Sequence, residues 1–164
     1  ITITLMAPSK TYNIAGLECS LAVVQNPEYI KKLKIAGRGL VSHVNILGYS
    51  AATAAYEHGQ EWLDQLLGYL TNNRDYLVNY IKENIPDIRI TAPEGTYLAW
   101  LDCRKLDILE SPYEFFLKNA KVALNNGNTF GNGGKGFVRL NFGCPKGLLK
   151  EGLDRMRQAV ENLN

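Results

Sequence analysis

The sequence reads Ala7-Pro8-Ser9-Lys10-Thr11-Tyr12-Asn13-Ile14-Ala15-Gly16-Leu17 around a lysine, and an apolar run from Ile1 to Met6 precedes this stretch. Proline biases the residue before it towards an extended backbone, so Pro8 favours a strand that ends here. We therefore expect Lys10 just past the carboxyl end of a strand, where α/β sheets bind their ligands. A lysine amine can form a Schiff base with a carbonyl compound or act as a base. Taken alone, Lys10 is a weak signal because most lysines are solvated surface charges.

A second motif lies near the other end of the chain and reads Gly127-Asn-Thr-Phe-Gly-Asn-Gly-Gly-Lys-Gly-Phe-Val-Arg-Leu-Asn-Phe-Gly-Cys-Pro145. Its centre alternates as a strand does over Phe137 to Phe142, which places Arg139 on the face opposite Val138 and Leu140. Such an arginine could extend to the surface or pair with an acid. Its planar guanidinium could instead bind a carboxylate through two hydrogen bonds. The glycine-rich stretch lacks a following Lys-Ser or Lys-Thr, so it is not a P-loop.

Together the two motifs resemble fold-type I pyridoxal-phosphate (PLP) enzymes of the class I/II aminotransferase superfamily. The first is similar to that superfamily's lysine segment, and the second to its carboxylate-binding arginine segment. The form Phe-Val-Arg-Leu-Asn-x-Gly-Cys-Pro and the run Thr96 to Asp102 most resemble the cystathionine β-lyase-like carbon-sulfur lyase branch. The resemblance implies an α/β fold and a carbon-sulfur β-lyase that converts cystathionine or a cysteine conjugate to a thiol, pyruvate and ammonia.

The resemblance also implies roles for individual residues. Lys10 binds PLP through a Schiff base and, once the substrate amine displaces it, removes the α-proton as general base. The cofactor acts as an electron sink. Arg139 binds the α-carboxylate of the amino-acid substrate, whereas Ser9 either donates to the cofactor phosphate or serves as a cap or turn residue. By analogy alone, residues 128–130 line the entrance to the site.

Two positions depart from the family's pattern. Many aminotransferases of the superfamily have a serine three residues before the lysine and an arginine eight residues after it, both for the phosphate, but here these positions are Ala7 and Glu18. The departure favours a lyase over an aspartate-type aminotransferase. Because the two reactions share their first half, an aminotransferase stays open as an alternative. A non-catalytic aminotransferase-like domain of a regulator is a further one.

The resemblance covers only the carboxyl-terminal part of the family's enzymes, so we expect a fragment. Residues 1–58 would end the large PLP-binding domain, residues 59–85 would form a long connecting helix, and residues 86–164 would form the small α/β domain. The absent part would carry the residues that stack on the cofactor ring, pair with its pyridine nitrogen and hold most of its phosphate. We therefore expect the fragment alone to be inactive. A homodimer is implied, since the family's active sites form at the subunit interface.

Composition excludes several other classes. The chain has 164 residues, a net charge of +2, 46% hydrophobic residues and 21% charged residues, which argues against nucleic acid or an anionic membrane as partner. No apolar run approaches the roughly 20 residues that span a bilayer. Cys19, Cys103 and Cys144 are odd in number and lack C-x-x-C spacing, so we expect buried, reduced thiols in a cytoplasmic protein and no metal site.

Local patterns predict the remaining elements. Asn26-Pro27 should open a helix that Gly37 closes, and Ser42 should cap an alanine-rich helix over residues 43–56. That helix could pack within one subunit or between two. The clearest periodicity predicts a long helix from Gln60 to Ile85, ended by Pro86. We expect strands at 18–24, 88–91, 96–102, 122–124 and 137–142, a capped helix from Ser111 and a last helix from Pro145.

Aromatic residues near the motifs have simpler explanations than a role in a site. Tyr12 is expected to pack against its neighbours. Tyr97 and Trp100, on the strand predicted over 96–102, are expected to belong to the core.

Overall fold

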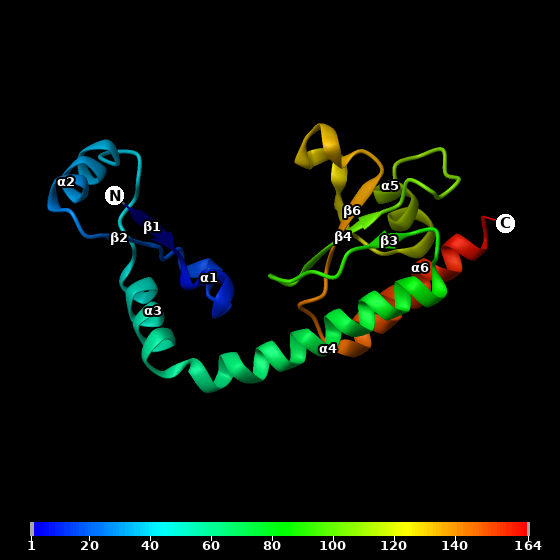
Figure 1. The fold of residues 1–164 in the computed structure, drawn as a ribbon, viewed down its shortest axis with the longest axis horizontal. Helices are drawn as coiled ribbons and strands as arrows, with labels where there is room; N and C mark the ends of the chain where they lie inside the picture. Colours follow the sequence, from blue (N-terminus) through cyan, green and yellow to red (C-terminus); the bar gives the residue numbers. More distant parts are fainter. Residues whose placement is uncertain (1, 164) are drawn as a thin grey trace. The chain divides into compact units, whose positions relative to one another are not determined.

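The structure is a computed structural model that describes residues 2–163 and divides into two compact units (Figure 1). Unit 1 is Ile1–Leu66 and unit 2 is Leu67–Asn164, with the end residues Ile1 and Asn164 outside the described part. Both units mix helices with strands, as expected, and the strand pairs among the described residues are antiparallel. The division falls inside a helix, and the domain boundaries expected at 58 and 86 stay predictions.

Unit 1 is built on a two-stranded hairpin. Strand β1 (Ile3–Met6) pairs with β2 (Leu21–Val24), in a register that sets Ile3 opposite Val24 and Met6 opposite Leu21. The strand expected from Ile1 is thus confirmed from Ile3 onward. Helix α1 (Pro8–Thr11) and a 3-10 turn (Ala15–Leu17) lie between the strands.

Two further helices follow in unit 1, and one starts later than expected. Helix α2 (Pro27–Ala36) begins after Asn26, whose side chain accepts a hydrogen bond from Glu28 N at 2.9 Å, and Gly37 ends it as predicted. Helix α3 (Ile46–His58) is capped by Asn45, so the prediction of Ser42 as its cap is wrong. The amide of Asn45 also donates to Leu17 O at 3.4 Å, and this tertiary contact helps to fix where the helix begins.

Helix α4 (Gln60–Asn84) is the longest element, with 25 residues, and ends one residue before the predicted Ile85. At 1.5 Å per residue it is about 37 Å long. Its buried residues all lie in the second half: Asn73, Leu77, Val78 and Ile81. The described helices include none that is both long and apolar enough to cross a membrane.

Unit 2 holds a four-stranded antiparallel sheet in the order β3-β4-β6-β5. The strands are β3 (Arg89–Ile90), β4 (Leu98–Asp102), β6 (Phe137–Asn141) and β5 (Asn125–Asn126). The strand expected at 122–124 is wrong, because the chain pairs with β6 only from Asn125 onward. The alternation predicted for β6 is confirmed, since Val138 and Leu140 are buried and Arg139 is not.

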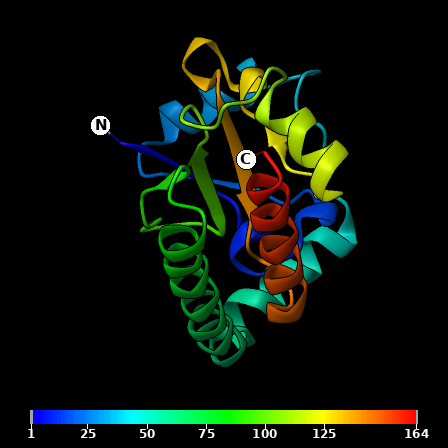
Figure 2. The ribbon, with the colours of Figure 1, turned by 90° about the vertical axis from the view of Figure 1, so that its right-hand side faces the viewer.

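Helices cover one face of this sheet. The core contains Ala99, Leu101, Val138 and Leu140 from the strands together with apolar residues of α4, α5 (Pro112–Phe115) and α6 (Lys146–Glu161). The second half of α4 and α6 run side by side (Figures 1 and 2), and Tyr80 Oη donates to Asp154 Oδ1 at 2.5 Å between them. These helices leave the opposite face of the sheet uncovered.

Two local features of unit 2 set the ends of its elements. Ser111 and Glu114 form the predicted capping box, with Glu114 N donating to Ser111 Oγ at 3.3 Å and Ser111 N to Glu114 Oε2 at 3.2 Å. Asn73 is fully buried, and its amide donates to Phe142 O at 3.0 Å and Cys144 O at 2.8 Å. This side chain therefore holds the turn between β6 and α6, and α6 begins after Pro145 as predicted.

Candidate functional site

Lys10 lies where the sequence predicts, just beyond the end of β1. Ala7 is extended, with φ −145° and ψ 131°, and Pro8 begins the short helix α1. Pro8 is buried, whereas Lys10 is exposed. Tyr12 N donates to Pro8 O at 2.9 Å and Ile14 N to Ser9 O at 3.0 Å, which closes a tight turn around the lysine. The turn presents a primary amine to the outside on a fixed backbone.

The lysine turn offers few groups that could bind the cofactor phosphate. Ser9 is half-buried next to Lys10, and its side chain carries a hydroxyl that could donate to a phosphate. Glu18 is exposed and left-handed, with φ 50°. A carboxylate there would repel a phosphate, because like charges raise each other's free energy. The structure thus leaves the role of Ser9 a prediction.

Tyr12 packs as expected and fixes the lysine turn to the neighbouring helices. Its ring meets Tyr56 edge-to-face at 5.6 Å and lies stacked on Trp62 at 6.5 Å between centroids. A Cβ at Gly59 would come within 2.8 Å of the Tyr12 ring, so only glycine allows this approach. Sequence reasoning missed the part that Gly59 plays, although a glycine between two helices is a usable signal.

Arg139 lies on the face of the unit 2 sheet opposite the core. Its Nε and Nη2 both donate to Asn125 Oδ1, at 3.3 and 3.2 Å, and its guanidinium carbon lies 4.6 Å from the centroid of the Phe130 ring. Among residues 2–163 no carboxylate forms an ion pair with Arg139. The arginine is therefore held by a neutral amide and an aromatic ring, and its charge is not compensated by an acid of this part of the chain.

An aromatic row lies beside Arg139 on the same face. Trp100 is the cross-strand partner of Arg139, stacks on Phe137 at 5.4 Å and meets Phe130 edge-to-face at 5.5 Å. Trp100 is 37% exposed, so the expectation that it belongs to the core is wrong. The reason is the alternation of β4, in which Ala99 and Leu101 fill the core positions. Tyr97, by contrast, packs against the core.

The glycine-rich loop brings Phe130 to the arginine by crossing itself closely. A Cβ at Gly127 would lie 2.2 Å from Gly134 O, and a Cβ at Gly134 would lie 1.9 Å from Gly127 O. Asn126 caps the turn by accepting from Asn128 N at 3.0 Å. The sequence predicts a loop here, but the contact of Phe130 with Arg139 depends on this backbone crossing. That residues 128–130 line an entrance stays a prediction.

The shifted pKa values of Asp102, Cys103 and Cys144 have ordinary structural causes. Arg104 donates to both carboxylate oxygens of Asp102 at 2.8 Å, and this pair lowers the pKa of Asp102 from 3.8 to about 2. Burial raises the pKa of the Cys103 thiol to about 12 and also raises that of Cys144. A raised pKa lowers the fraction of thiolate, the reactive form, in both cysteines at neutral pH. The described residues hold no group of acids, histidines and cysteines suited to a metal ion.

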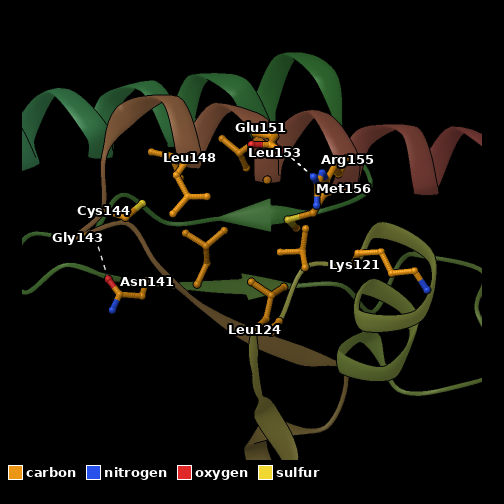
Figure 3. Close-up of a pocket in the computed structure, with 15 residues that line it drawn as sticks. Lys121, Leu124, Asn141, Gly143, Cys144, Leu148, Glu151, Leu153, Arg155 and Met156 are labelled. Atoms are coloured by element: carbon orange, nitrogen blue, oxygen red, sulfur yellow. Dashed lines mark hydrogen bonds and ion pairs between the residues drawn. The ribbon is translucent and has the colours of Figure 1, made fainter.

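A cavity of about 470 Å³ lies on the helix-covered side of unit 2, between α6 and the segment before β5 (Figure 3). Its lining is mostly apolar and includes Leu124, Leu140, Leu153 and Met156, with an ion pair between Glu151 and Arg155 at its edge. Arg139 does not line it, because Leu140 points into the core from the same strand. The cavity is therefore separate from the arginine.

Residues 2–156 match the family model described as aminotransferase class I and II. The chain belongs to this family. It is 35% identical over 164 residues to cystathionine beta-lyase PatB of Bacillus subtilis, covering 98% of this chain and 42% of PatB.

Solved structures agree with this assignment. Cystalysin from Treponema denticola, in a structure that contains pyridoxal 5'-phosphate, is 32% identical with a TM-score of 0.90, over 99% of this chain and 42% of that one. A PLP-bound C-S lyase from Staphylococcus hominis is 36% identical with a TM-score of 0.87, over 99% and 43%. These matches confirm the fold-type I class expected from the resemblance. The chain spans less than half the length of these relatives.

Proposed function

We propose that the full-length protein carrying this chain is a PLP-dependent carbon-sulfur β-lyase acting on cystathionine or a cysteine conjugate. The observation that carries the proposal is Arg139, a half-buried cation held by a neutral amide and without an acidic partner in residues 2–163. Such a group suits a ligand carboxylate, because a guanidinium binds it through two parallel hydrogen bonds. The names of the relatives, cystathionine beta-lyase and C-S lyase, support the choice of reaction.

Lys10 would hold the cofactor and move the proton. The residues present fit a covalent link, since Lys10 is an exposed primary amine on a fixed turn, with the Ser9 hydroxyl next to it. When bound, PLP supplies an electron sink for the charge left on the substrate α-carbon. Once the substrate amine had displaced it from the cofactor, the Lys10 amine would take the α-proton. The bond between the β-carbon and sulfur would then break with its electron pair leaving on sulfur, and the proton held by Lys10 is available to convert this thiolate to the thiol. Water then converts the remaining three-carbon fragment to pyruvate and ammonia.

The chain on its own offers few groups for the cofactor phosphate. In the segment between β1 and β2, Ser9 could donate a hydrogen bond to it, whereas the Glu18 carboxylate would repel it. We therefore infer that the isolated 164-residue chain is inactive. The remaining phosphate contacts would come from polypeptide that the relatives have and this chain does not span, given that it covers 42% of PatB.

An aminotransferase is the second candidate, and the family model that matches residues 2–156 favours it by its own description. Both reactions need a lysine that moves the α-proton and an arginine that binds the carboxylate. They differ in whether a β-leaving group is expelled or a 2-oxoacid accepts the amino group. Only the products separate them.

We also propose a cytoplasmic homodimer. Helix α3 supports a subunit interface, because Ile46, Leu47 and Tyr49 are 76%, 67% and 60% exposed and such side chains favour burial against a partner. The three cysteines are free thiols, as is usual in a reducing compartment.

Product analysis of the full-length protein with PLP and L-cystathionine tests the function. We expect pyruvate, ammonia and a thiol without any added 2-oxoacid, and loss of this activity in Lys10→Ala. Lys31→Ala, which removes another exposed lysine of unit 1, is the matched control and should stay active. Amino-group transfer that requires a 2-oxoacid would make the protein an aminotransferase. Bound PLP with no reaction would point to a regulator.

A further inference from the structure

The two edges of the Arg139 guanidinium differ in this structure. A guanidinium can bind a planar partner side-on, through Nε and Nη2, or end-on, through Nη1 and Nη2. Asn125 Oδ1 accepts from Nε at 3.3 Å and from Nη2 at 3.2 Å, so the side-on edge is already used. Within residues 2–163 these are the hydrogen bonds that the Arg139 side chain makes, which leaves Nη1 and the second N–H of Nη2 for a ligand.

We propose that Asn125 is a positioning residue that orients Arg139 so that a substrate carboxylate binds end-on, through Nη1 and Nη2. The proposal rests on the proposed function, in which Arg139 is the carboxylate anchor. It adds a residue that does not itself touch the substrate. Asn125 acts only through the arginine, whose side chain would otherwise rotate among many conformers.

The sheet register makes the contact possible. Asn125 is the cross-strand partner of Arg139 on β5, so the two side chains leave the sheet on the same face. On the other side of Arg139 its partner is Trp100, which is packed edge-to-face on Phe130. Phe130 in turn lies 4.6 Å from the guanidinium and covers one of its faces. The arginine is thus fixed at one edge and one face before any ligand arrives.

The chemistry of the amide matters as much as its place. An asparagine oxygen accepts hydrogen bonds without carrying charge, so the positive charge of Arg139 remains available. An aspartate in the same position would form an ion pair and compete with the ligand carboxylate. Fixing a flexible side chain in advance also removes part of the ordering cost of binding. Loss of the amide should therefore weaken carboxylate binding, and its replacement by an acid should weaken it more.

The first experiment follows the Arg139 Nε–H by ¹⁵N–¹H NMR in the 164-residue chain itself, without cofactor or turnover. We expect a resolved Nε–H signal with slow solvent exchange, and exchange that is several-fold faster in Asn125→Ala. Asn79→Ala, an exposed asparagine on α4, is the control and should leave the signal unchanged. Asn125 is itself exposed, so its loss should not unfold unit 2. An unchanged Nε–H signal in Asn125→Ala would overturn the proposal.

The second experiment measures kcat and KM of the full-length enzyme with L-cystathionine. We expect KM to rise several-fold in Asn125→Ala and further in Asn125→Asp, with kcat changed less than KM. If Asn125 had only a structural role, the uncharged Asn125→Ala substitution would not raise KM less than Asn125→Asp does. If Arg139→Lys raises KM but neither Asn125 variant does, the inference is wrong and the proposed function stands. If none of the three raises KM, Arg139 is not the anchor and the proposed function loses its main support.

Discussion

Units 1 and 2 differ in how far they bury their own apolar side chains. In unit 1 the buried residues among those described are Pro8, Cys19, Gly48 and Ala52, while Leu5 of β1 is 74% exposed. Unit 2 has a continuous core with fully buried residues from strands and helices, such as Leu101, Phe116 and Leu153. Unit 2 therefore buries enough apolar surface to be stable as a domain, whereas unit 1 buries too little.

The difference explains how the two motifs are supported. Arg139 lies on a sheet whose other face is fixed in the core, so its geometry with Asn125 is set within unit 2. Lys10 lies on a short helix held by Pro8 and by the contacts of Tyr12. Because β1 and part of β2 expose apolar residues, we expect other polypeptide to cover this hairpin in the full-length protein.

The largest expected effect comes from removing a buried aromatic residue of unit 2. Phe116 is fully buried, and Phe116→Ala should lower the free energy of unfolding of unit 2 by about 3–5 kcal/mol, from lost burial and the cavity left behind. Leu5→Ala in unit 1 is the comparison and should change it by less than about 0.5 kcal/mol. Urea denaturation followed by circular dichroism measures both. Equal effects would contradict the contrast between the units.

Removal of a helix cap should have a smaller effect on stability, and each unit has a side-chain cap that can be removed. Ser111 caps α5 in unit 2 and Asn26 caps α2 in unit 1, each by accepting a backbone N–H hydrogen bond. Ser111→Ala should destabilise unit 2 by about 1 kcal/mol, since a lost cap leaves an N–H unsatisfied. Asn26→Ala should leave the same urea transition unchanged. A shift of that transition by Asn26→Ala would mean that unit 1 contributes to it.

The smallest effect concerns pH. Arg104 lowers the pKa of Asp102 from 3.8 to about 2, first of all through their side-chain hydrogen bonds. Because the folded pKa lies below the unfolded one, the pair stabilises unit 2 above pH 3.8, and this contribution is lost as the pH falls through about 2. The gain is small because Arg104 is well exposed. In Arg104→Ala an NMR titration should find the Asp102 pKa back near its ordinary value, and an unchanged pKa would disprove the pairing.

Patterns that depend on one segment of chain were predictable. The periodicity of α4, the capping box at Ser111 and the alternation of β6 each follow from local sequence, and the structure confirms them. The place of Lys10 after β1 follows from Pro8 in the same way. Local rules work here because the physical cause lies within a few residues.

Features that depend on contacts between distant segments were missed. Asn45 replaces Ser42 as the cap of α3, and its amide contacts Leu17, 28 residues earlier in the sequence. Trp100 was expected in the core, but the alternation along β4 gives the core positions to Ala99 and Leu101, and the pairing with β6 sets Trp100 opposite Arg139. Asn125 lies outside the strands predicted at 122–124 and 137–142, and only the register of β5 brings it to Arg139. No pattern within one segment indicates these partners.

The most direct test of the account is to locate the cofactor on the full-length protein. Reduction of the PLP-bound protein with borohydride, followed by tryptic digestion and mass spectrometry, fixes the cofactor to the lysine that binds it. We expect the added mass on Lys10, together with loss of tryptic cleavage after that residue and a peptide that continues to Lys31. Added mass on another lysine, or on none, would contradict the assignment of Lys10 and with it the proposed lyase.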